Sequence, residues 1–467
     1  MKLYNTLTKS VEVITPLQSP AVTLYTCGPT VYDFPHVGNW FTFIRYDVLV
    51  RALKANHLQP KWVMNITDVG HLVSDADEGE DKLEKGARRE GKTAWDIAKF
   101  YGDYFIQGLN RLNILQPDFL PKATEHIDEQ IRLVKTLEEK GFTYAISDGV
   151  YFDTSKFPKY AEFAGLDLDE QQAGARVEYN PEKRNATDFA LWKFSPKDEK
   201  RDMEWDSPWG KGFPGWHIEC SAMSMKYLGE TLDIHSGGID HIPVHHSNEI
   251  AQSEAATGKP FANYWMHANH ITVNGEKISK SLGNGITLED IEAKGSSLEA
   301  FRLHVLESHY RNQSKFSWES LDAAQNRLKN WQAAAVLRYQ TASSSSGGTT
   351  FTATEIQTQL TELLGDDLNT PRALVLLSGI FGQLESTGLH SAHVAEFETL
   401  LVFIDSLLGL TLAAQADIDD DLKQLISARE SARSKQDWTK SDELRDQLTS
   451  QGIGLRDTEQ GAIWFRL

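Results

Sequence analysis

The pattern of apolar and polar positions predicts a strand, a helix and a second strand near the start of the chain. Residues 22–27 and 60–67 are short apolar runs typical of buried strands. Between them, from about residue 39 to 56, apolar residues recur at the spacing of one helix face. The same reasoning predicts a further strand at 232–235 and helices near 93–113, 121–141 and 245–257.

Strands that alternate with helices are typical of a mostly parallel sheet. We therefore expect an α/β Rossmann-like domain with a parallel sheet that is split by an insertion. Its first half is assigned to residues 1–115, the insertion to 116–212 and its second half to 213–297.

Beyond about residue 298 the pattern changes to helical periodicity with few β-branched runs, which predicts an α-helical bundle over 298–412. A serine- and glycine-rich stretch at 342–348 interrupts this region and is typical of a flexible loop. Residues 413–467 contain a charged helix pair and a short terminal strand near 461–465, so we expect a small C-terminal α+β tail.

Composition narrows the function classes. The chain has 467 residues and a formal net charge of -19, which argues against a protein that mainly coats nucleic acid but leaves room for local basic patches. The N-terminus lacks the apolar core of a signal peptide, and the longest apolar run is far below the ~20 residues that span a bilayer. We expect a cytoplasmic protein with no membrane partner, acting as a monomer.

The two cysteines, Cys27 and Cys220, each lie within a cluster of metal- or nucleotide-binding side chains. Cys220 is followed 25 residues later by His245, and Glu249 lies one helical turn beyond it. A Cys, Cys, His, Glu set fits a tetrahedral zinc site, because His245 and Glu249 would share one helix face. The alternative is that the cysteines only pack in the core and that the His/Glu pair is a surface contact.

Two short motifs point to a nucleotide. His36, Gly38 and Asn39 lie between a predicted strand and a predicted helix, where a helix N-terminus offers N–H groups to phosphate. Lys277 and Lys280, in the sequence Lys-Ile-Ser-Lys-Ser, place two compact positive charges in a polar loop. Each motif alone is weak, since each is also common in solvated loops, but together in this order they are more specific.

These motifs resemble the His-Ile-Gly-His and Lys-Met-Ser-Lys-Ser signatures of class I aminoacyl-tRNA synthetases, and the chain is more closely similar to the cysteinyl-tRNA synthetase family. The resemblance covers nearly the whole chain, including the tail. The matching text lies at residues 27–33, 65–68, 172–177, 214–223, 245–253 and 367–371.

The resemblance implies an ATP-dependent ligase that joins L-cysteine to tRNA(Cys), with one Zn²⁺ per chain and with ATP and Mg²⁺ as substrate. It implies a set of roles that fall on specific residues of this sequence. The zinc ligands would be Cys27, Cys220, His245 and Glu249; the catalytic residues His36, Asn39, Lys277 and Lys280; the ATP-binding residues Gly28, Pro29, His36, Gly38, Asn39 and Lys280; and the cysteine-binding residues Thr67, Trp216, His217, His235, Asp240 and His246.

Zinc would solve a selectivity problem. Cysteine and serine differ by one atom, and shape alone separates such near-isosteres only modestly. A thiol has a pKa of about 8.5 and ionises on zinc, whereas a serine hydroxyl is a much poorer ligand. We expect the substrate thiolate to bind zinc directly, so that no editing domain is needed.

For the tRNA, the resemblance implies that the bundle supports the tRNA stems and that the tail reads the anticodon through Arg433, Asp442 and Asp457. A solvated charged face is the alternative for these residues. Two rival functions remain open at this point: a cysteine ligase of the mycothiol type, which would lack the tail, and a non-catalytic zinc-dependent RNA-binding paralogue.

The sequence departs from the family pattern at four positions. Asn39 stands in place of the last signature histidine, Ile278 in place of methionine, Val244 in place of proline, and Ser247 in place of glutamate. The last two adjoin the expected zinc ligands, so they bear on how the metal is tuned.

Overall fold

The structure is a computed structural model that describes residues 1–70, 81–160, 162–165, 180–196, 201–278, 283–340, 352–458 and 461–467. It divides into two compact units. The first unit comprises Met1–Asp290 and Tyr310–Phe316, and the second comprises Ile291–His309 and Ser317–Leu467.

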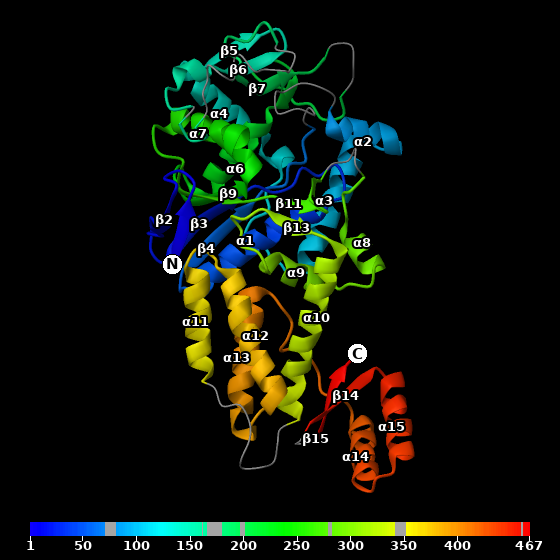
Figure 1. The fold of residues 1–467 in the computed structure, drawn as a ribbon. Helices are drawn as coiled ribbons and strands as arrows, with labels where there is room; N and C mark the ends of the chain where they lie inside the picture. Colours follow the sequence, from blue (N-terminus) through cyan, green and yellow to red (C-terminus); the bar gives the residue numbers. More distant parts are fainter. Residues whose placement is uncertain are drawn as a thin grey trace. The chain divides into compact units, whose positions relative to one another are not determined.

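A four-stranded parallel sheet forms the centre of the first unit (Figure 1). Its order is β10-β9-β3-β4, so the strands of the two expected halves meet where β3 pairs with β9. All three pairings are parallel, as the alternation of strands and helices predicts. The strands are β3 (Ala21–Thr26), β4 (Gln59–Met64), β9 (Leu232–Gly238) and β10 (Ala262–Ala268).

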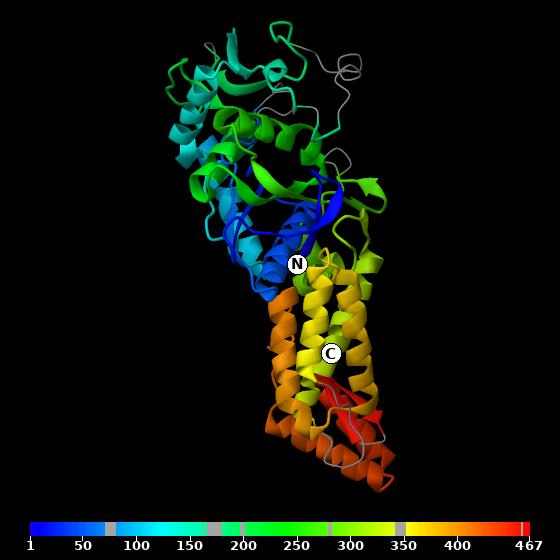
Figure 2. The same ribbon diagram turned by 90° about the vertical axis from the view of Figure 1, so that its left-hand side faces the viewer.

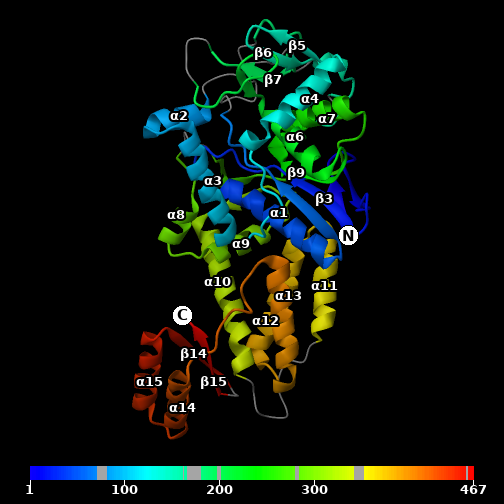
Figure 3. The same cartoon turned by 180° about the vertical axis from the view of Figure 1, so that it is seen from behind.

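Helices cover both faces of this sheet. Helix α1 (Val37–Ala55) packs against β4 and β9, and α6 (Trp216–Leu228) packs against β3 and β4. Figures 1 and 3 show these two helices on opposite sides of the sheet. The other helices of this unit are α2 (Lys82–Glu90), α3 (Ala94–Arg111), α4 (Ile127–Glu139) and α7 (Ser247–Thr257). This arrangement agrees with the predicted Rossmann-like domain.

Helix α1 shows why this segment folds as it does. Its buried side includes Trp40 and Phe43, which pack against Phe105 of α3 with ring centroids 5.6 Å and 4.9 Å apart. A Cβ atom at Gly108 would overlap the Trp40 ring, so the glycine lets α3 approach α1 closely. Burial of these rings against each other fixes the helix that begins at the first nucleotide motif.

The segment between the two halves of the sheet forms its own antiparallel sheet, in the order β5-β6-β7-β8. Its strands are β5 (Thr143–Ile146), β6 (Gly149–Phe152), β7 (Phe189–Phe194) and β8 (Gly212–Pro214). The remaining strands of the first unit are β1 (Lys2–Asn5), β2 (Ser10–Val13), β11 (Ile271–Val273), β12 (Glu276–Lys277) and β13 (Ser314–Phe316).

The second unit contains the predicted helices, with one correction. We expected helical periodicity from 298 to 340, but β13 interrupts it; this strand belongs to the first unit, where it pairs in parallel with β11. A strand of three residues is too short to show the alternation of apolar and polar positions by which strands are recognised, so it was not distinguished from the surrounding helical sequence. The helices here are α9 (Leu298–Leu306), α10 (Trp318–Ala335), α11 (Ala353–Gly365), α12 (Thr370–Thr387) and α13 (Val394–Leu408), with α8 (Leu288–Ala293) before them.

Helices α10 to α13 lie side by side (Figures 1 and 2), and α11 contacts both α12 and α13. The tail consists of α14 (Asp420–Ser434), α15 (Trp438–Ser450) and an antiparallel hairpin of β14 (Ile453–Thr458) and β15 (Gly461–Arg466). Trp464 of β15 is buried among Ile418, Leu422 and Leu448, so the predicted terminal strand completes a small core. None of the described helices combines the length and apolar character that a membrane span needs.

Candidate metal centre and active site

The carboxyl ends of the central strands carry the candidate site residues. Cys27 follows β3 directly, His235 lies within β9, and Thr67 follows β4 by three residues. The Cys27 N–H donates to the Ser236 carbonyl at 3.0 Å, which keeps Cys27 in register with β9. Parallel strands place their carboxyl ends at one edge, and such an edge is the usual ligand site of an open α/β sheet.

The four expected zinc ligands converge. One donor atom from each of Cys27, Cys220, His245 and Glu249 lies within 4.8 Å of every other, and all four side chains are buried. The His245 Nε2 and the Glu249 Oε1 are 3.1 Å apart. Residues from two distant parts of the chain thus form one compact donor set, whose softness and number fit a zinc ion.

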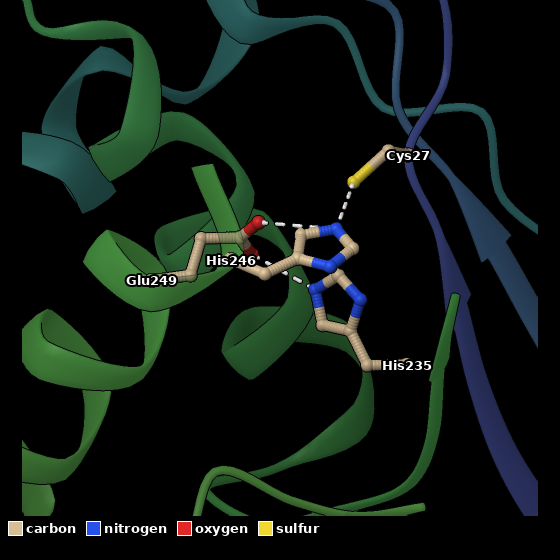
Figure 4. Close-up of side chains that lie close together, drawn as sticks. All are labelled: Cys27, His235, His246 and Glu249. Atoms are coloured by element: carbon tan, nitrogen blue, oxygen red, sulfur yellow. Dashed lines mark hydrogen bonds and ion pairs between the residues drawn. The ribbon is translucent and has the colours of Figure 1, made fainter. Parts of the chain in front are cut away.

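A second donor set overlaps the first (Figure 4). It consists of Cys27, His235, His246 and Glu249, again within 4.8 Å of one another. The Cys27 Sγ is 3.3 Å from His246 Nε2, and the Glu249 Oε2 is 2.9 Å from His235 Nε2. Cys27 and Glu249 therefore belong to both sets.

The local backbone differs from the expected helix at this point. We predicted a helix from residue 245, but Ile242–His246 form a π-helical turn and α7 begins only at Ser247. The wider turn places both His245 and His246 beside Glu249, at 3.1 Å and 3.9 Å from its Oε1 atom. Such single π turns are frequent at functional sites because they redirect side chains without ending the helix.

The two thiols differ in acidity. A hydrogen bond from Cys27 to the Cys220 sulfur lowers the pKa of Cys220 to about 7, although burial opposes this, and His245 acts in the same direction. Burial raises the pKa of Cys27 well above its usual value, and the hydrogen bond to Cys220 adds to this. Cys220 is thus the more acidic of the two thiols, and a bound cation would favour the thiolate form of both.

Glu249 and His245 of the first set stabilise each other's charged forms. Burial would raise the pKa of Glu249, but His235 and His245 overcome it and hold that pKa at about 2. Burial would lower the pKa of His245, but the negative charges of Glu249 and Cys220 raise it to about 10. The pocket is therefore strongly anionic and takes up a proton on His245, which a metal ion would displace.

The Oε1 atom of Glu249 shows whether the surroundings of the donor set suit a metal ion. The Glu249 side chain is fully buried, yet its Oε1 atom accepts no hydrogen bond from the described residues. It faces the Nε2 atoms of His245 and His246 instead. A buried carboxylate oxygen that accepts no hydrogen bond and faces two imidazoles beside two thiols suits a cation, so the residues present fit a zinc ion.

Thr67 is held at the same edge of the sheet by a chain of hydrogen bonds. Its hydroxyl donates to Glu219 Oε2 at 3.0 Å and accepts from Asn65 Nδ2 at 3.0 Å. The Asn65 Oδ1 in turn accepts from the Gly28 N–H at 2.8 Å. A Cβ atom at Gly28 would overlap the Asn65 carbonyl oxygen, so only glycine fits at this position.

The other expected cysteine-binding residues lie around the donor sets. Trp216 packs against His245 with ring centroids 4.6 Å apart, and His217 shares a 2.9 Å hydrogen bond with the Nδ1 of His245. His235 and His246 belong to the second donor set. Asp240 is exposed in a short turn that precedes the π-helical turn. The structure thus groups four of these side chains around the centre.

The first nucleotide motif caps helix α1. The His36 Nδ1 accepts hydrogen bonds from the N–H groups of Gly38 and Asn39, and the Asn39 Oδ1 accepts from the His36 N–H at 3.0 Å. We expected unpaired N–H groups here, and that expectation is wrong for Gly38 and Asn39 because the motif's own imidazole satisfies them. Because the Oδ1 atom of Asn39 accepts the capping hydrogen bond, the Nδ2 group is the donor that this side chain can offer to a ligand.

The second motif packs against the first. A Cβ atom at Gly38 would lie 2.9 Å from the Ile278 Cδ1, and the Val37 N–H donates to the Ile286 carbonyl at 2.8 Å. Lys277 is exposed at the end of β12. Lys280 lies outside the described residues. The structure therefore places the first signature segment beside Ile278 and Ile286, which flank the part of the second segment that contains Lys280.

In the tail, Asp457 lies among arginines. Arg429 contacts both of its carboxylate oxygens, at 2.7 Å and 2.9 Å, and Arg433 lies 3.1 Å from Oδ2. The hydrogen bonds from Arg429 lower the pKa of Asp457. Asp442, on α15, is exposed. Of the three expected anticodon residues, two are therefore in direct contact with each other.

Comparison with known proteins decides the family. Residues 13–326 match the family described as "tRNA synthetases class I (C) catalytic domain", and residues 415–464 match the "Cysteinyl-tRNA ligase anticodon binding domain". The chain is 45% identical to "Cysteine--tRNA ligase 1" of Burkholderia lata, over 100% of this chain and 97% of that protein. It is 42% identical to "Cysteine--tRNA ligase" of Treponema denticola, over 100% of both. The chain belongs to the cysteine–tRNA ligase family.

Solved structures agree with the fold of a class I synthetase. A methionyl-tRNA synthetase of Mycobacterium tuberculosis, in complex with methionyl-adenylate, superposes with a TM-score of 0.61 at 14% identity. The match covers 85% of this chain and 93% of that one. At this identity the likeness concerns the fold alone, and it confirms the predicted Rossmann-like domain followed by helices.

Several residues that support this cysteine–tRNA ligase site were not singled out from the sequence. His267 hydrogen-bonds His246 at 2.7 Å, Glu219 accepts from Thr67, and Arg429 binds Asp457. Glu219 lies in the matching segment 214–223 next to Cys220, and Asn65 lies in the matching segment 65–68, so the family resemblance was an available signal for those two. His267 and Arg429 carry no local signal, because each acts through a partner far away in the chain.

Proposed function

We propose that this chain is a cysteine–tRNA ligase that activates L-cysteine with ATP and transfers it to the 3′-terminal ribose of tRNA(Cys). The observation that carries the proposal is the convergence of Cys27, Cys220, His245 and Glu249 within 4.8 Å, in a chain that belongs to this family over its full length. A thiol substrate accounts for a soft metal site that lies in the same chain as two nucleotide motifs.

Zinc recognition of the substrate sulfur is the proposed source of selectivity. When bound, zinc supplies a Lewis acid that stabilises the substrate sulfur as a thiolate, which a serine hydroxyl does not match. Trp216 covers His245 from one side and helps to exclude water. Thr67, whose hydroxyl proton is committed to Glu219, keeps acceptor capacity for the substrate ammonium group.

Activation of the amino acid requires groups that stabilise charge on ATP. The cysteine carboxylate attacks the α-phosphate, and pyrophosphate leaves with Mg²⁺. His36, Asn39, Lys277 and Lys280 are proposed to donate to the phosphate oxygens as their charge builds up, while Gly28, Pro29 and Gly38 let the nucleotide approach the backbone. Positioning of the two reactants accounts for most of the remaining effect.

Transfer then occurs on the activated carbonyl, which the terminal ribose hydroxyl of the tRNA attacks as AMP leaves. We assign residues 1–115 and 213–297 to the catalytic domain, 116–212 to the insertion, 298–412 to the tRNA stems and 413–467 to the anticodon. Arg433, Asp442 and Asp457 are the proposed anticodon contacts. We expect the chain to act as a monomer in the cytoplasm.

Cysteine-dependent ATP–pyrophosphate exchange tests the activation step. The exchange rate with cysteine should exceed the rate with serine at equal concentration by several orders of magnitude, and comparable rates would refute zinc–thiolate selection. Lys280→Ala should slow the exchange about 100-fold or more while the zinc content stays unchanged. A Lys280→Ala variant with an unaltered rate would contradict the role of that lysine.

Charging of purified tRNA tests the second step. Labelled cysteine should become attached to tRNA(Cys), and an amino-sugar acceptor should receive none. Transfer to the amino sugar instead would identify a ligase of the mycothiol type. The absence of any exchange activity in zinc-loaded protein would favour the non-catalytic RNA-binding alternative.

A further inference from the structure

The segment that joins the bundle to the tail is fixed by side chains. Residues 409–419, here called the connector, run from α13 to α14 without forming a helix or a strand. A loop of this kind usually satisfies its backbone groups with water and is mobile. In this protein charged side chains bind several of those groups instead, so the connector is held in one conformation.

Helices α9 and α13 hold the first half of the connector. The carboxylate of Asp405, on α13, accepts hydrogen bonds from the N–H groups of Leu412 and Ala413 at 2.8 Å and 2.7 Å. The carboxylate of Glu299, on α9, accepts from the N–H and the hydroxyl of Thr411 at 2.7 Å and 3.0 Å. Three successive backbone donors of the connector are therefore bound to the bundle.

Arg338 holds the second half of the connector. It lies in the 3₁₀ helix Val336–Tyr339, which continues α10, and only 7% of the residue is exposed. Its Nη2 group donates to the carbonyl oxygens of Ala413 and Gln415 at 2.8 Å and 2.6 Å. The Tyr339 hydroxyl donates to the Gln415 carbonyl at 3.2 Å. The planar guanidinium fixes the direction of the chain between the two carbonyls, whereas the ammonium group of a lysine has no such planar geometry.

Gln340 binds the tail itself. Its Oε1 atom accepts from the Trp464 N–H at 2.7 Å, and its Nε2 group donates to the Trp464 carbonyl at 3.0 Å. The side-chain amide thus pairs with β15 much as a residue of a neighbouring strand would. Val336, one helical turn earlier, is buried in the same apolar cluster as Ile418 and Trp464. The end of α10 is therefore joined to the tail by paired hydrogen bonds and by apolar contact.

We infer that Arg338 and Gln340 are positioning residues for tRNA charging, which fix the tail on the bundle so that recognition of the anticodon contributes to the transfer of cysteine. The inference rests on the proposed function, in which the tail contacts the anticodon. Both side chains bind backbone groups of the connector and of β15. They would thus act on the tRNA through the tail and not by contact with the reacting atoms.

A defined position of the tail matters because one tRNA molecule has to meet two sites. A tail that moved freely would still bind the anticodon, but it would no longer help to hold the acceptor end of the same tRNA in place. A misplacement of about 1 Å at a reacting centre can cost about 100-fold in rate.

The tail has packing of its own that does not depend on these two side chains. Leu422, Leu448 and Trp464 share one buried cluster, and Arg429 binds Asp457 within the tail. Loss of Arg338 or Gln340 is therefore expected to loosen the attachment of the tail while the tail itself stays folded.

Charging of two tRNAs tests the inference. We would compare Arg338→Ala and Gln340→Ala with the matched control Arg327→Ala, since Arg327 also lies on α10 but pairs with Glu307 at 2.7 Å. The substrates are tRNA(Cys) and the same tRNA with its anticodon bases replaced. Both test variants should lower kcat/KM for the normal tRNA about 10- to 100-fold, toward the value for the replaced anticodon. Cysteine-dependent pyrophosphate exchange, which needs no tRNA, should stay unchanged, and the control should behave as the unaltered protein.

Hydrogen exchange separates positioning from loss of the fold. In Arg338→Ala the amides of the connector should exchange faster, whereas those of α14 and α15 should keep their protection. Arg338→Lys, which retains the charge, should recover part of the charging rate. An anticodon preference equal to that of the unaltered protein in both test variants, or a loss of protection in α14 and α15 in both, would overturn the inference. Equal charging of the two tRNAs by the unaltered protein would instead refute the anticodon role of the tail, on which the inference rests.

Discussion

Thr67 donates a hydrogen bond of 3.0 Å to the buried carboxyl group of Glu219. The acceptor is fully buried, and burial raises its pKa well above the ordinary value, with Asp68 adding to the effect. Thr67 also receives a hydrogen bond from Asn65. The Thr67 hydroxyl therefore has a fixed direction, and its remaining lone pair can accept from the substrate.

Replacing this hydroxyl tests its role in binding cysteine. Thr67→Val keeps the side-chain shape but leaves the buried Glu219 and Asn65 groups without their shared partner. We expect a loss of about 1–3 kcal/mol in transition-state stabilisation, which lowers kcat/KM for cysteine in pyrophosphate exchange roughly 5- to 150-fold. Thr257→Val, at a helix end in the same unit, is the matched control and should change little. An unaltered kcat/KM in Thr67→Val would exclude the proposed contact.

Much of the fold follows from local patterns. The strands at β3 and β4 and helix α1 lie within three residues of the expected ranges, because buried strands and a long helix have strong periodic signals. The strand β13 was missed, since three residues carry no period. The π-helical turn at Ile242–His246 was also missed, because a single widened turn leaves the apolar spacing nearly unchanged.

The site was predictable where a residue type carries its own chemistry. Cysteine is rare in this chain, so Cys27 and Cys220 stood out as metal-ligand candidates. His267 and Arg429 did not, because their importance depends on contacts with His246 and Asp457, which are distant in the sequence. Their partners are set by tertiary packing, and nothing in the neighbouring residues encodes them.

The side chain of Asn39 has two separable functions. Its Oδ1 atom caps helix α1 by accepting from the His36 N–H at 3.0 Å, and its Nδ2 group is the proposed phosphate donor. Asn39→Asp keeps the capping acceptor and places a negative charge at the helix N-terminus, where it is favourable. We expect unchanged thermal stability and a rate of pyrophosphate exchange about 10²- to 10³-fold lower.

Asn39→Ala provides the contrast, because it removes both functions. It should lower the free energy of unfolding by about 1 kcal/mol through loss of the cap, in addition to slowing the exchange. Chemical denaturation and exchange assays on the same preparations would separate the two effects. Equal exchange rates in Asn39→Asp and the unaltered protein would show that Nδ2 donates nothing to ATP.

Metal removal should destabilise the first unit. Zinc binds only the folded donor set, so at a free concentration about 1,000 times its dissociation constant it stabilises the fold by about 4 kcal/mol. We expect a chelator to lower the melting temperature and added zinc to restore it. Glu249→Gln, which loses a ligand of both donor sets, should melt at a temperature that no longer depends on zinc. A melting temperature of the unaltered protein that is independent of zinc would contradict a structural contribution from the metal.

The carboxylate of Asp457 already binds Arg429, so a contact with the anticodon would have to form beside this pair. Arg429 is almost fully buried and binds both carboxylate oxygens, while Arg433 and Arg445 lie 3.1 Å and 3.8 Å from Oδ2. Asp457→Ala would leave the Arg429 guanidinium buried without its acceptor. We expect this to lower the stability of the tail by about 1–3 kcal/mol, measured by chemical denaturation.

The same pair gives the tail a defined response to acid. Hydrogen bonds from Arg429 depress the pKa of Asp457 in the folded state, so its contribution to stability is complete above the ordinary carboxyl pKa and is lost as pH falls through the depressed value. Asp457→Asn should remove this part of the acid sensitivity. If Asp457 acts by holding Arg433 in place, Asp457→Asn should raise KM for tRNA and leave pyrophosphate exchange unchanged. Exchange is measured without tRNA, so it serves as the control for the activation step. A KM for tRNA that matches that of the unaltered protein would confine Asp457 to a structural role.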